Sequence, residues 1–143
     1  MKILQIKSSI LGENSTSNKY STKLIESFLN EHDSVIIRDV ALNPVTQLSG
    51  EVLGQLSNQD SLVAKEHNNL IEEIKQADIV VIGAPMYNFS IPATLKNYFD
   101  AITKAGITFK YNEQGQPVGF LTNKKTYVII SRGGQYKSQG MTF

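Results

Sequence analysis

The sequence contains no cysteine and only two histidines among its 143 residues. Without cysteine, the chain has no disulfide, no thiolate metal site, no iron–sulfur cluster and no cysteine nucleophile. His32 and His67 lie far apart on predicted helices, with no carboxylate at metal-ligand spacing. The sequence therefore predicts neither a metal enzyme nor a cysteine enzyme.

Long apolar runs are also missing. No stretch approaches the ~20 residues of a membrane-spanning helix, and Met1 to Lys7 is too short and too charged for a signal peptide. Lys and Arg number 14 against 13 Asp and Glu, so the net charge of +1 gives no reason to expect nucleic acid or an anionic membrane as a partner. We expect a soluble cytoplasmic protein of one domain, because 143 residues are enough to bury a core.

Strand-like and helix-like patterns alternate along the chain. The clearest strand begins at Asp78 as an unbroken β-branched run, which is typical of a strand buried on both faces of a parallel sheet. Residues 43–60 contain at most a short helix, and residues 107–125 form a polar excursion, interpreted as a loose hairpin or a lid. Other strands are expected at residues 2–8, 33–40 and 126–130, and helices at about residues 17–31, 61–77 and 92–106.

This alternation is the pattern of an α/β fold with a doubly wound parallel sheet. A sheet of this kind normally has a fifth strand and a further covering helix, yet the sequence stops at Phe143, shortly after the fourth predicted strand. We expect either that the chain is truncated at its C-terminus or that a partner or an unusual edge completes the sheet. The sequence alone leaves both explanations open.

Three loops follow predicted strands one, three and four, and all three face the same edge of such a sheet, where ligands bind. The first loop holds Ser9 and leads through Ser15, Thr16 and Ser17 into a helix. The unpaired N–H groups and the dipole of a helix N-terminus attract an anion, to which hydroxyl groups can also donate. Plain helix capping is the alternative for these hydroxyls. Neither GxGxxG nor GxxxxGKS/T is present, which argues against a dinucleotide fold of the usual kind and against a P-loop.

The second loop, residues 85–92, reads Pro-Met-Tyr-Asn-Phe-Ser-Ile-Pro. Its first half combines two aromatic rings, one amide and several backbone donors and acceptors, a mixture that suits a planar heteroaromatic ring with a polar edge. The alternative is that Met86 and Phe89 fill the core at a strand–helix junction. The third loop, Ser-Arg-Gly-Gly at residues 131–134, has two glycines where the backbone turns tightly or approaches a ligand, with a simple turn as the alternative.

Together these motifs resemble a known family. Ser9 with the hydroxyl run at 15–17, PMYNFSIPATLKNYFD at residues 85–100 and SRGG at 131–134 are similar to the FMN-dependent NADH:quinone oxidoreductases, or NADH-azoreductases, of the flavodoxin-like NAD(P)H dehydrogenase group. The resemblance extends from Met1 to the last residues. Residues 85–100 are its most specific part, whereas SRGG alone would be weak.

The resemblance implies a flavodoxin-like fold with strand order 2-1-3-4-5. On this resemblance the fifth strand and last helix would be missing from this chain, and residues 1–143 would be a single, C-terminally truncated FMN-binding domain. It also implies non-covalent FMN, NADH as the electron donor, and a homodimer with two active sites at the subunit interface. In the implied ping-pong reaction, NADH gives a hydride to flavin N5, and the reduced flavin passes two electrons to a quinone or an azo compound. No catalytic residue is implied, because the flavin carries the chemistry.

The resemblance also assigns roles to the three loops. Hydroxyls of the first loop would hold the phosphate and ribityl chain, the second loop would contact the isoalloxazine through its backbone and Asn88, and the third would contact the pyrimidine edge. Phe120, on the excursion that could cover the flavin, is a weaker candidate for lining the substrate pocket. The implied FMN-binding residues are Ser9, Ser15, Thr16, Ser17, Pro85, Met86, Tyr87, Asn88, Phe89, Ser131, Arg132, Gly133 and Gly134.

Two other functions compete with this one. A flavodoxin-like electron carrier, or an inactive binding module, would bind FMN without oxidising NADH, but a lid formed by residues 107–125 would hinder docking of a redox partner. A phosphodiesterase or other hydrolase would need a metal site or a nucleophile–base pair, which this sequence lacks. The sequence leaves open the physiological acceptor and the choice between NADH and NADPH.

Overall fold

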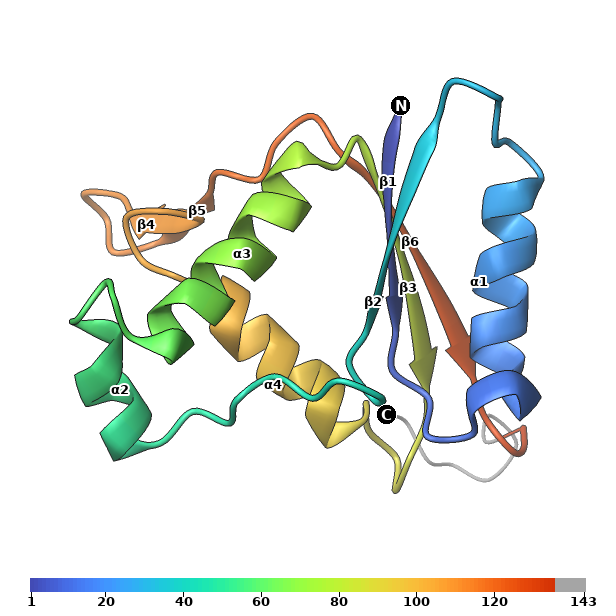
Figure 1. Cartoon of the computed structure of the whole chain (residues 1–143), viewed down its shortest axis with the longest axis horizontal. Helices are drawn as coiled ribbons and strands as arrows, with labels where there is room; N and C mark the ends of the chain where they lie inside the picture. The colour runs from blue at the N-terminus through green and yellow to red at the C-terminus, as the bar shows by residue number, and fades with distance from the viewer. Residues whose placement is uncertain (136–143) are drawn as a thin grey trace.

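The computed structural model describes residues 1–135, and its centre is a sheet of four parallel strands (Figure 1). These strands are β1 (Lys2–Lys7), β2 (Ser34–Asp39), β3 (Ile79–Pro85) and β6 (Lys125–Ser131). Their order in the sheet is β2-β1-β3-β6. This order matches the first four positions of the predicted order 2-1-3-4-5, so the flavodoxin-like, doubly wound α/β fold is confirmed.

Helices cover both faces of this sheet (Figure 1). On one face lies α1 (Thr16–Glu26), which follows the short 3-10 helix η1 (Gly12–Asn14). On the other face lie α3 (Leu62–Gln76) and α4 (Ala93–Ile102), and the shorter α2 (Gly50–Leu56) packs on α3. The shortness of α2 agrees with the prediction that residues 43–60 hold no long helix.

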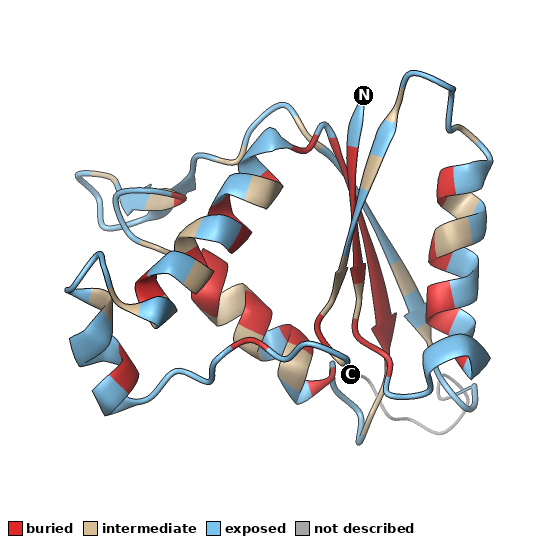
Figure 2. Ribbon diagram, in the orientation of Figure 1, coloured by how far each residue is buried: buried red, intermediate tan, exposed pale blue. Residues whose placement is uncertain are grey.

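The alternation of side chains along the strands divides the hydrophobic core into two parts. Leu4 and Val80 point to the α3–α4 face and belong to a large apolar core. Ile3 and Val81 point to the α1 face, where they form a small apolar core with Ile25 of α1. As predicted, β3 is buried along its whole length (Figure 2).

The α1 face also buries polar side chains. Gln5, in the middle of β1, donates through Nε2 to Ser21 Oγ at 2.8 Å and to Thr22 Oγ1 at 2.9 Å, both on α1. Ser21 Oγ in turn donates to the backbone oxygen of Asn18 at 2.9 Å. Because these buried groups satisfy one another, they fix the position of α1 over β1.

Three of the helices begin in the same way. In each, a serine hydroxyl accepts a hydrogen bond from the backbone N–H three residues later, at 3.1 Å, 3.2 Å and 3.1 Å respectively. These bonds satisfy N–H groups that would otherwise be unpaired in the first helical turn. The capping serines are Ser15 on α1, Ser49 on α2 and Ser61 on α3.

The prediction for the end of α1 is wrong. The apolar spacing favours a helix to about Glu31, but α1 ends at Glu26. Asn30 and Asp33 close a turn instead: Asn30 N–H donates to Asp33 Oδ2 and Asp33 N–H donates to Asn30 O, both at 3.0 Å. Local side-chain bonding of this kind competes with helix continuation. Leu29, which fits the apolar spacing, is accordingly exposed.

The excursion of residues 107–125 contains the predicted hairpin, formed by β4 (Phe109–Tyr111) and β5 (Pro117–Gly119). In Figure 1 the hairpin lies beyond α3 and α4, on the opposite side of the molecule from the carboxyl ends of β3 and β6. It therefore does not form a lid over the loops of its own chain. Phe120 follows β5, and the Lys110 ammonium lies 5.9 Å from the centroid of its ring.

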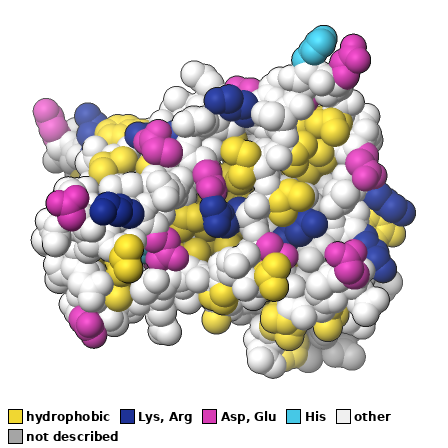
Figure 3. Space-filling view, in the orientation of Figure 1, with side chains coloured by type: hydrophobic (Ala, Val, Ile, Leu, Met, Phe, Trp, Pro, Cys, Tyr) yellow, Lys and Arg dark blue, Asp and Glu magenta, His cyan; other side chains and the backbone are white. Residues whose placement is uncertain are grey.

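The surface carries side chains of both charge signs. Figure 3 shows them mixed across this view and separated by hydrophobic patches. The two edges of the sheet are β2 and β6, and β6 exposes Val128 and Ile130. No helix in the described part of the chain is long and apolar enough to cross a membrane.

Candidate functional site

The loops after β1, β3 and β6 meet around one cavity at the carboxyl edge of the sheet. The cavity has a volume of about 250 Å³. All three predicted loops contribute to its wall, so the structure brings them together as the sheet topology requires. The lining residues are Ser9, Leu11, Ser15, Thr16, Pro85, Met86, Tyr87, Ser131, Arg132 and Gly133.

The other predicted site residues lie elsewhere. Ser17 is fully buried in the first turn of α1. Asn88 and Phe89 form an exposed turn that continues the second loop, and Gly134 is exposed in the third. Phe120 directly follows β5, and the β4–β5 hairpin lies away from all three loops (Figure 1).

Hydrogen bonds tie the three loops to one another. The backbone N–H of Met86 donates to the Ser131 oxygen at 2.7 Å, which links the second loop to the third. The hydroxyl of Tyr87 lies 3.1 Å from Ser9 Oγ, which links the second loop to the first. Below them, Ser8 Oγ donates to the Gly83 oxygen at 2.7 Å and joins β1 to β3. Hydrogen bonds therefore connect all three loops that form the cavity wall.

The hydroxyl groups of the first loop act as helix caps and also reach the cavity. Ser15 Oγ accepts from the Asn18 N–H at 3.1 Å and lies 3.2 Å from Ser17 Oγ. Both serines are buried, whereas Thr16 is exposed at the cavity. Since α1 begins here, its unpaired N–H groups and positive dipole end add attraction for an anion.

Gly83 allows the start of α1 to approach β3 closely. A Cβ atom at this position would lie 3.4 Å from both Asn18 Oδ1 and the Ser17 oxygen. Any larger side chain would therefore push the helix N-terminus away from the sheet. Because Gly83 has no side chain, the first turn of α1 can pack directly against β3.

The second loop contains a strained turn. Asn88 and Phe89 have φ angles of 50° and 64°, in the left-handed region. The turn is closed by two backbone hydrogen bonds, from Tyr87 N–H to the Ser90 oxygen at 2.9 Å and from Ser90 N–H to the Tyr87 oxygen at 3.1 Å. Asparagine tolerates this conformation, but for phenylalanine it costs about 1–3 kcal/mol. Phe89 is 51% exposed, so core filling does not explain it.

The electrostatics of the cavity favour an anion. Arg132, exposed in the third loop, is the one charged residue among the described residues that line it. None of those residues is a carboxylate, and the remaining polar groups of the wall are hydroxyls and backbone. Within residues 1–135, no group of three or more His, Asp or Glu side chains is placed to hold a metal ion. The arrangement can bind and orient a ligand, but it offers no acid–base pair of its own.

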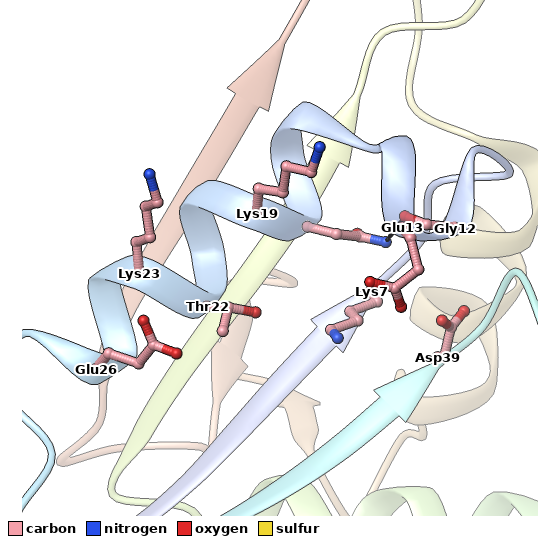
Figure 4. Close-up of a pocket in the computed structure, with 9 residues that line it drawn as sticks. Lys7, Gly12, Glu13, Lys19, Thr22, Lys23, Glu26 and Asp39 are labelled. Carbon is pink, nitrogen blue, oxygen red and sulfur yellow. Dashed lines mark hydrogen bonds between the residues drawn. The ribbon is translucent and has the colours of Figure 1, made fainter.

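A second cavity, of about 360 Å³, lies beside α1 (Figure 4). Lysines and carboxylates both line it, among them Lys7 at the end of β1, Glu13 in η1 and Asp39 at the end of β2. Because its charges are of both signs, this cavity does not favour an anion as the first cavity does. It is also separate from the second and third loops.

Sequence reasoning missed Ile10 and Leu11. Leu11 lines the cavity, and the Ile10 N–H donates to the Tyr87 hydroxyl at 3.1 Å. Both side chains are exposed. The available signal was the occurrence of two large apolar residues in an otherwise polar loop.

The chain is similar to known proteins along its whole length. A family described as "Flavodoxin-like fold" matches residues 1–143. The chain is 45% identical over 141 residues to the FMN-dependent NADH:quinone oxidoreductase 1 of Photobacterium profundum, covering 94% of this chain and 71% of that protein. It is 44% identical over 145 residues to the FMN-dependent NADH:quinone oxidoreductase of Escherichia coli (strain K12), covering 95% of this chain and 72% of that protein.

Solved structures give the same result. The crystal structure of an FMN-dependent NADH-azoreductase from Bacillus anthracis str. Ames Ancestor in complex with FMN matches with a TM-score of 0.83 at 25% identity, covering 97% of this chain and 72% of that one. An azoreductase from Bacillus anthracis str. Sterne matches with a TM-score of 0.72 at 29% identity, covering 98% of this chain and 72% of that one.

Proposed function

Because this chain belongs to the flavodoxin-like fold family, together with the FMN-dependent NADH:quinone oxidoreductases, we propose that it is an FMN-dependent oxidoreductase. It takes electrons from NADH and passes them through bound FMN to quinones and azo compounds. The observation that carries the proposal is the convergence of the three loops on one cavity with a cationic and hydroxyl-rich wall.

The residues present fit FMN at both of its ends. A phosphate needs donors and positive potential, which the Ser9 and Thr16 hydroxyls, Arg132 and the N-terminus of α1 supply without an opposing carboxylate. A planar ring needs a flat surface with polar edges, which the backbone of Met86–Phe89 supplies in its strained turn. The exposed glycines 133 and 134 let the backbone approach the remaining edge of the ring.

In this proposal the cofactor carries out the redox reaction, and the protein binds and positions the cofactor. When bound, FMN supplies the redox chemistry, a hydride taken from NADH and two electrons given to the acceptor in a ping-pong cycle. The chain would hold the phosphate through the hydroxyls of Ser9, Ser15 and Thr16, through the first turn of α1 and through the charge of Arg132. The hydrogen bond from Met86 N–H to the Ser131 oxygen keeps the second and third loops at a fixed separation in the wall of the cavity.

We further propose that the active protein is a homodimer. Figure 1 shows the β4–β5 hairpin on the other side of the molecule from these loops, and neither the hairpin nor Phe120, which directly follows it, is among the residues that line the cavity. In a dimer this hairpin could reach the cavity of the partner, which would give Phe120 the substrate-lining role that the sequence suggests. The 41% exposure of Phe120 leaves its ring available for such a contact.

The direct test is to purify the chain with FMN and to record the visible absorption of bound flavin, followed by NADH oxidation with a soluble quinone. Bound flavin with quinone-dependent NADH oxidation is the expected result. Flavin uptake without NADH oxidation would instead indicate an electron carrier that needs a separate reductase. A folded chain that takes up no flavin would contradict the proposal.

Asn88 gives a sharper test of the ring end. Asn88→Ala would change two properties at once. It removes the amide, and it also destabilises the fold by about 1 kcal/mol, because alanine tolerates the φ of 50° poorly. Asn88→Gly removes the amide but permits the turn, so it should weaken FMN and riboflavin binding by the same factor, about tenfold, with little loss of stability. Flavin titration and urea unfolding of both variants measure this. Unchanged flavin affinity in Asn88→Gly would remove Asn88 from the site.

A further inference from the structure

The side chain of Tyr87 crosses from the second loop to the first. Its hydroxyl oxygen Oη lies 3.1 Å from Ser9 Oγ and 3.1 Å from the backbone nitrogen of Ile10. Tyr87 and Ser9 are 78 positions apart in the chain, so this contact is a product of the fold. One hydroxyl group therefore joins the loop that faces the ring to the loop that faces the phosphate.

The directions of these hydrogen bonds follow from their donors. The Ile10 N–H can only donate, so Tyr87 Oη is its acceptor. The Leu11 N–H likewise donates to Ser9 Oγ, at 3.3 Å. The geometry of the contact between Tyr87 and Ser9 allows either hydroxyl to donate. Because the phenol is the more acidic hydroxyl and hence the better donor, we assign the single Tyr87 proton to Ser9 Oγ.

Ser9 Oγ then accepts two hydrogen bonds, which fills both of its acceptor sites. Its own proton is left for a ligand in the cavity that Ser9 lines. We propose that Tyr87 is a positioning residue that makes Ser9 an obligate hydrogen-bond donor and thereby selects a phosphate oxygen at this end of the cavity. The inference rests on the proposed function, in which Ser9 holds the FMN phosphate.

This arrangement distinguishes a phosphate from an alcohol. A phosphate oxygen carries negative charge and lone pairs, so a fixed donor gives it a charge-assisted hydrogen bond. The terminal hydroxyl of riboflavin both donates and accepts, and an obligate donor satisfies only its accepting half. Tyr87 therefore contributes to FMN binding and hardly to riboflavin binding, although its side chain belongs to the ring-facing loop.

The test compares Tyr87→Phe, which removes only Oη, with the wild-type chain. Fluorescence titration of the flavin-free protein gives the dissociation constants of FMN and riboflavin. We expect FMN binding to weaken about tenfold, as for the loss of one charge-assisted hydrogen bond, and riboflavin binding to change by less than about twofold. In a Ser9→Ala background the same substitution should have no further effect, because Tyr87 acts through Ser9.

Tyr127→Phe is the matched control, since it removes a tyrosine hydroxyl from β6, where the ring stacks on Phe28. It should leave both dissociation constants unchanged. Circular dichroism establishes that each variant is folded, and if Tyr87→Phe does not fold, Ser9→Ala must show the same FMN-selective loss.

Three results would overturn the inference. Equal weakening of FMN and riboflavin would mean that Tyr87 merely holds the loops together, and additive effects of the two substitutions would mean that it does not act through Ser9. A wild-type chain that binds neither flavin would overturn the proposed function, and this inference with it.

Discussion

The two faces of the sheet are built from different chemistry. The α3–α4 face packs its helices through the large apolar core, whereas the α1 face combines the small apolar core with buried hydroxyl and amide groups. The buried polar residues on the α1 side include Gln5, Ser15, Ser17, Asn18 and Ser21. The cavity lies at the N-terminus of α1. The comparison teaches that the large apolar core lies on one face of the sheet, whereas the cavity proposed to bind the ligand lies beside the more polar face.

The largest effects are expected when one buried isoleucine is replaced on each face of the sheet. Ile71 on α3 and Ile25 on α1 are 2% and 4% exposed. Ile71→Ala should lower the free energy of unfolding by about 2–5 kcal/mol and leave FMN affinity unchanged, because its core does not support the cavity. Ile25→Ala should lower stability and weaken FMN binding together, because α1 presents the phosphate end. Urea unfolding and flavin titration measure the two effects.

If FMN affinity falls in Ile71→Ala while the chain is still folded, the two faces are coupled and the comparison fails. The same holds if Ile25→Ala destabilises the chain without any effect on flavin binding.

A smaller effect is expected from the helix caps. Ser15 caps α1 and Ser61 caps α3 with the same geometry, each accepting an N–H at 3.1 Å. Ser15→Ala and Ser61→Ala should each lower the free energy of unfolding by about 1 kcal/mol. Only Ser15→Ala should also weaken FMN binding, because only this cap lines the cavity. Equal flavin affinities of the two variants would show that Ser15 is a cap and nothing more.

The smallest effect is a dependence of stability on pH that arises on the α3–α4 face. Burial lowers the pKa of His67 below its usual value of 6.5; Lys104 lowers it further, and Glu66 opposes both. The folded chain therefore holds fewer protons on this residue than the unfolded chain. The contribution of His67 to stability is present above about pH 6.5 and is lost as the pH falls from there through the folded pKa.

Thermal unfolding between about pH 8 and about pH 5 measures this dependence. His67→Gln should flatten the slope, whereas His32→Gln should leave it unchanged, because the His32 side chain is 93% exposed. A slope that survives in His67→Gln would have to come from another group.

Much of the fold could be predicted because its strands are marked by short β-branched runs. The run after Asp78 became β3, the one strand buried throughout among those described, and the alternation of elements indicated the doubly wound sheet. The end of α1 could not be predicted, because the apolar spacing continues to Leu29 while the bonds between Asn30 and Asp33 break the helix.

The sequence predicted which loops form the candidate site, but it did not predict which hydrogen bonds connect them. Parallel strands bring their carboxyl ends to one edge, so the convergence of three loops followed from topology. The left-handed conformation of Phe89 did not follow, because phenylalanine has no preference for it. The contact of Tyr87 with Ser9 and Ile10 depends on how far one side chain reaches across the finished fold.

The outer edge of β6 has a practical consequence for handling the protein. Among residues 1–135, β6 pairs with β3 alone, and Val128 and Ile130 are 51% and 67% exposed beside its unpaired backbone. An edge of this kind is a template onto which another molecule can add a strand. At high protein concentration we expect chains to aggregate through this edge. The substitution Ile130→Lys places a charge there and should therefore raise the solubility of the protein.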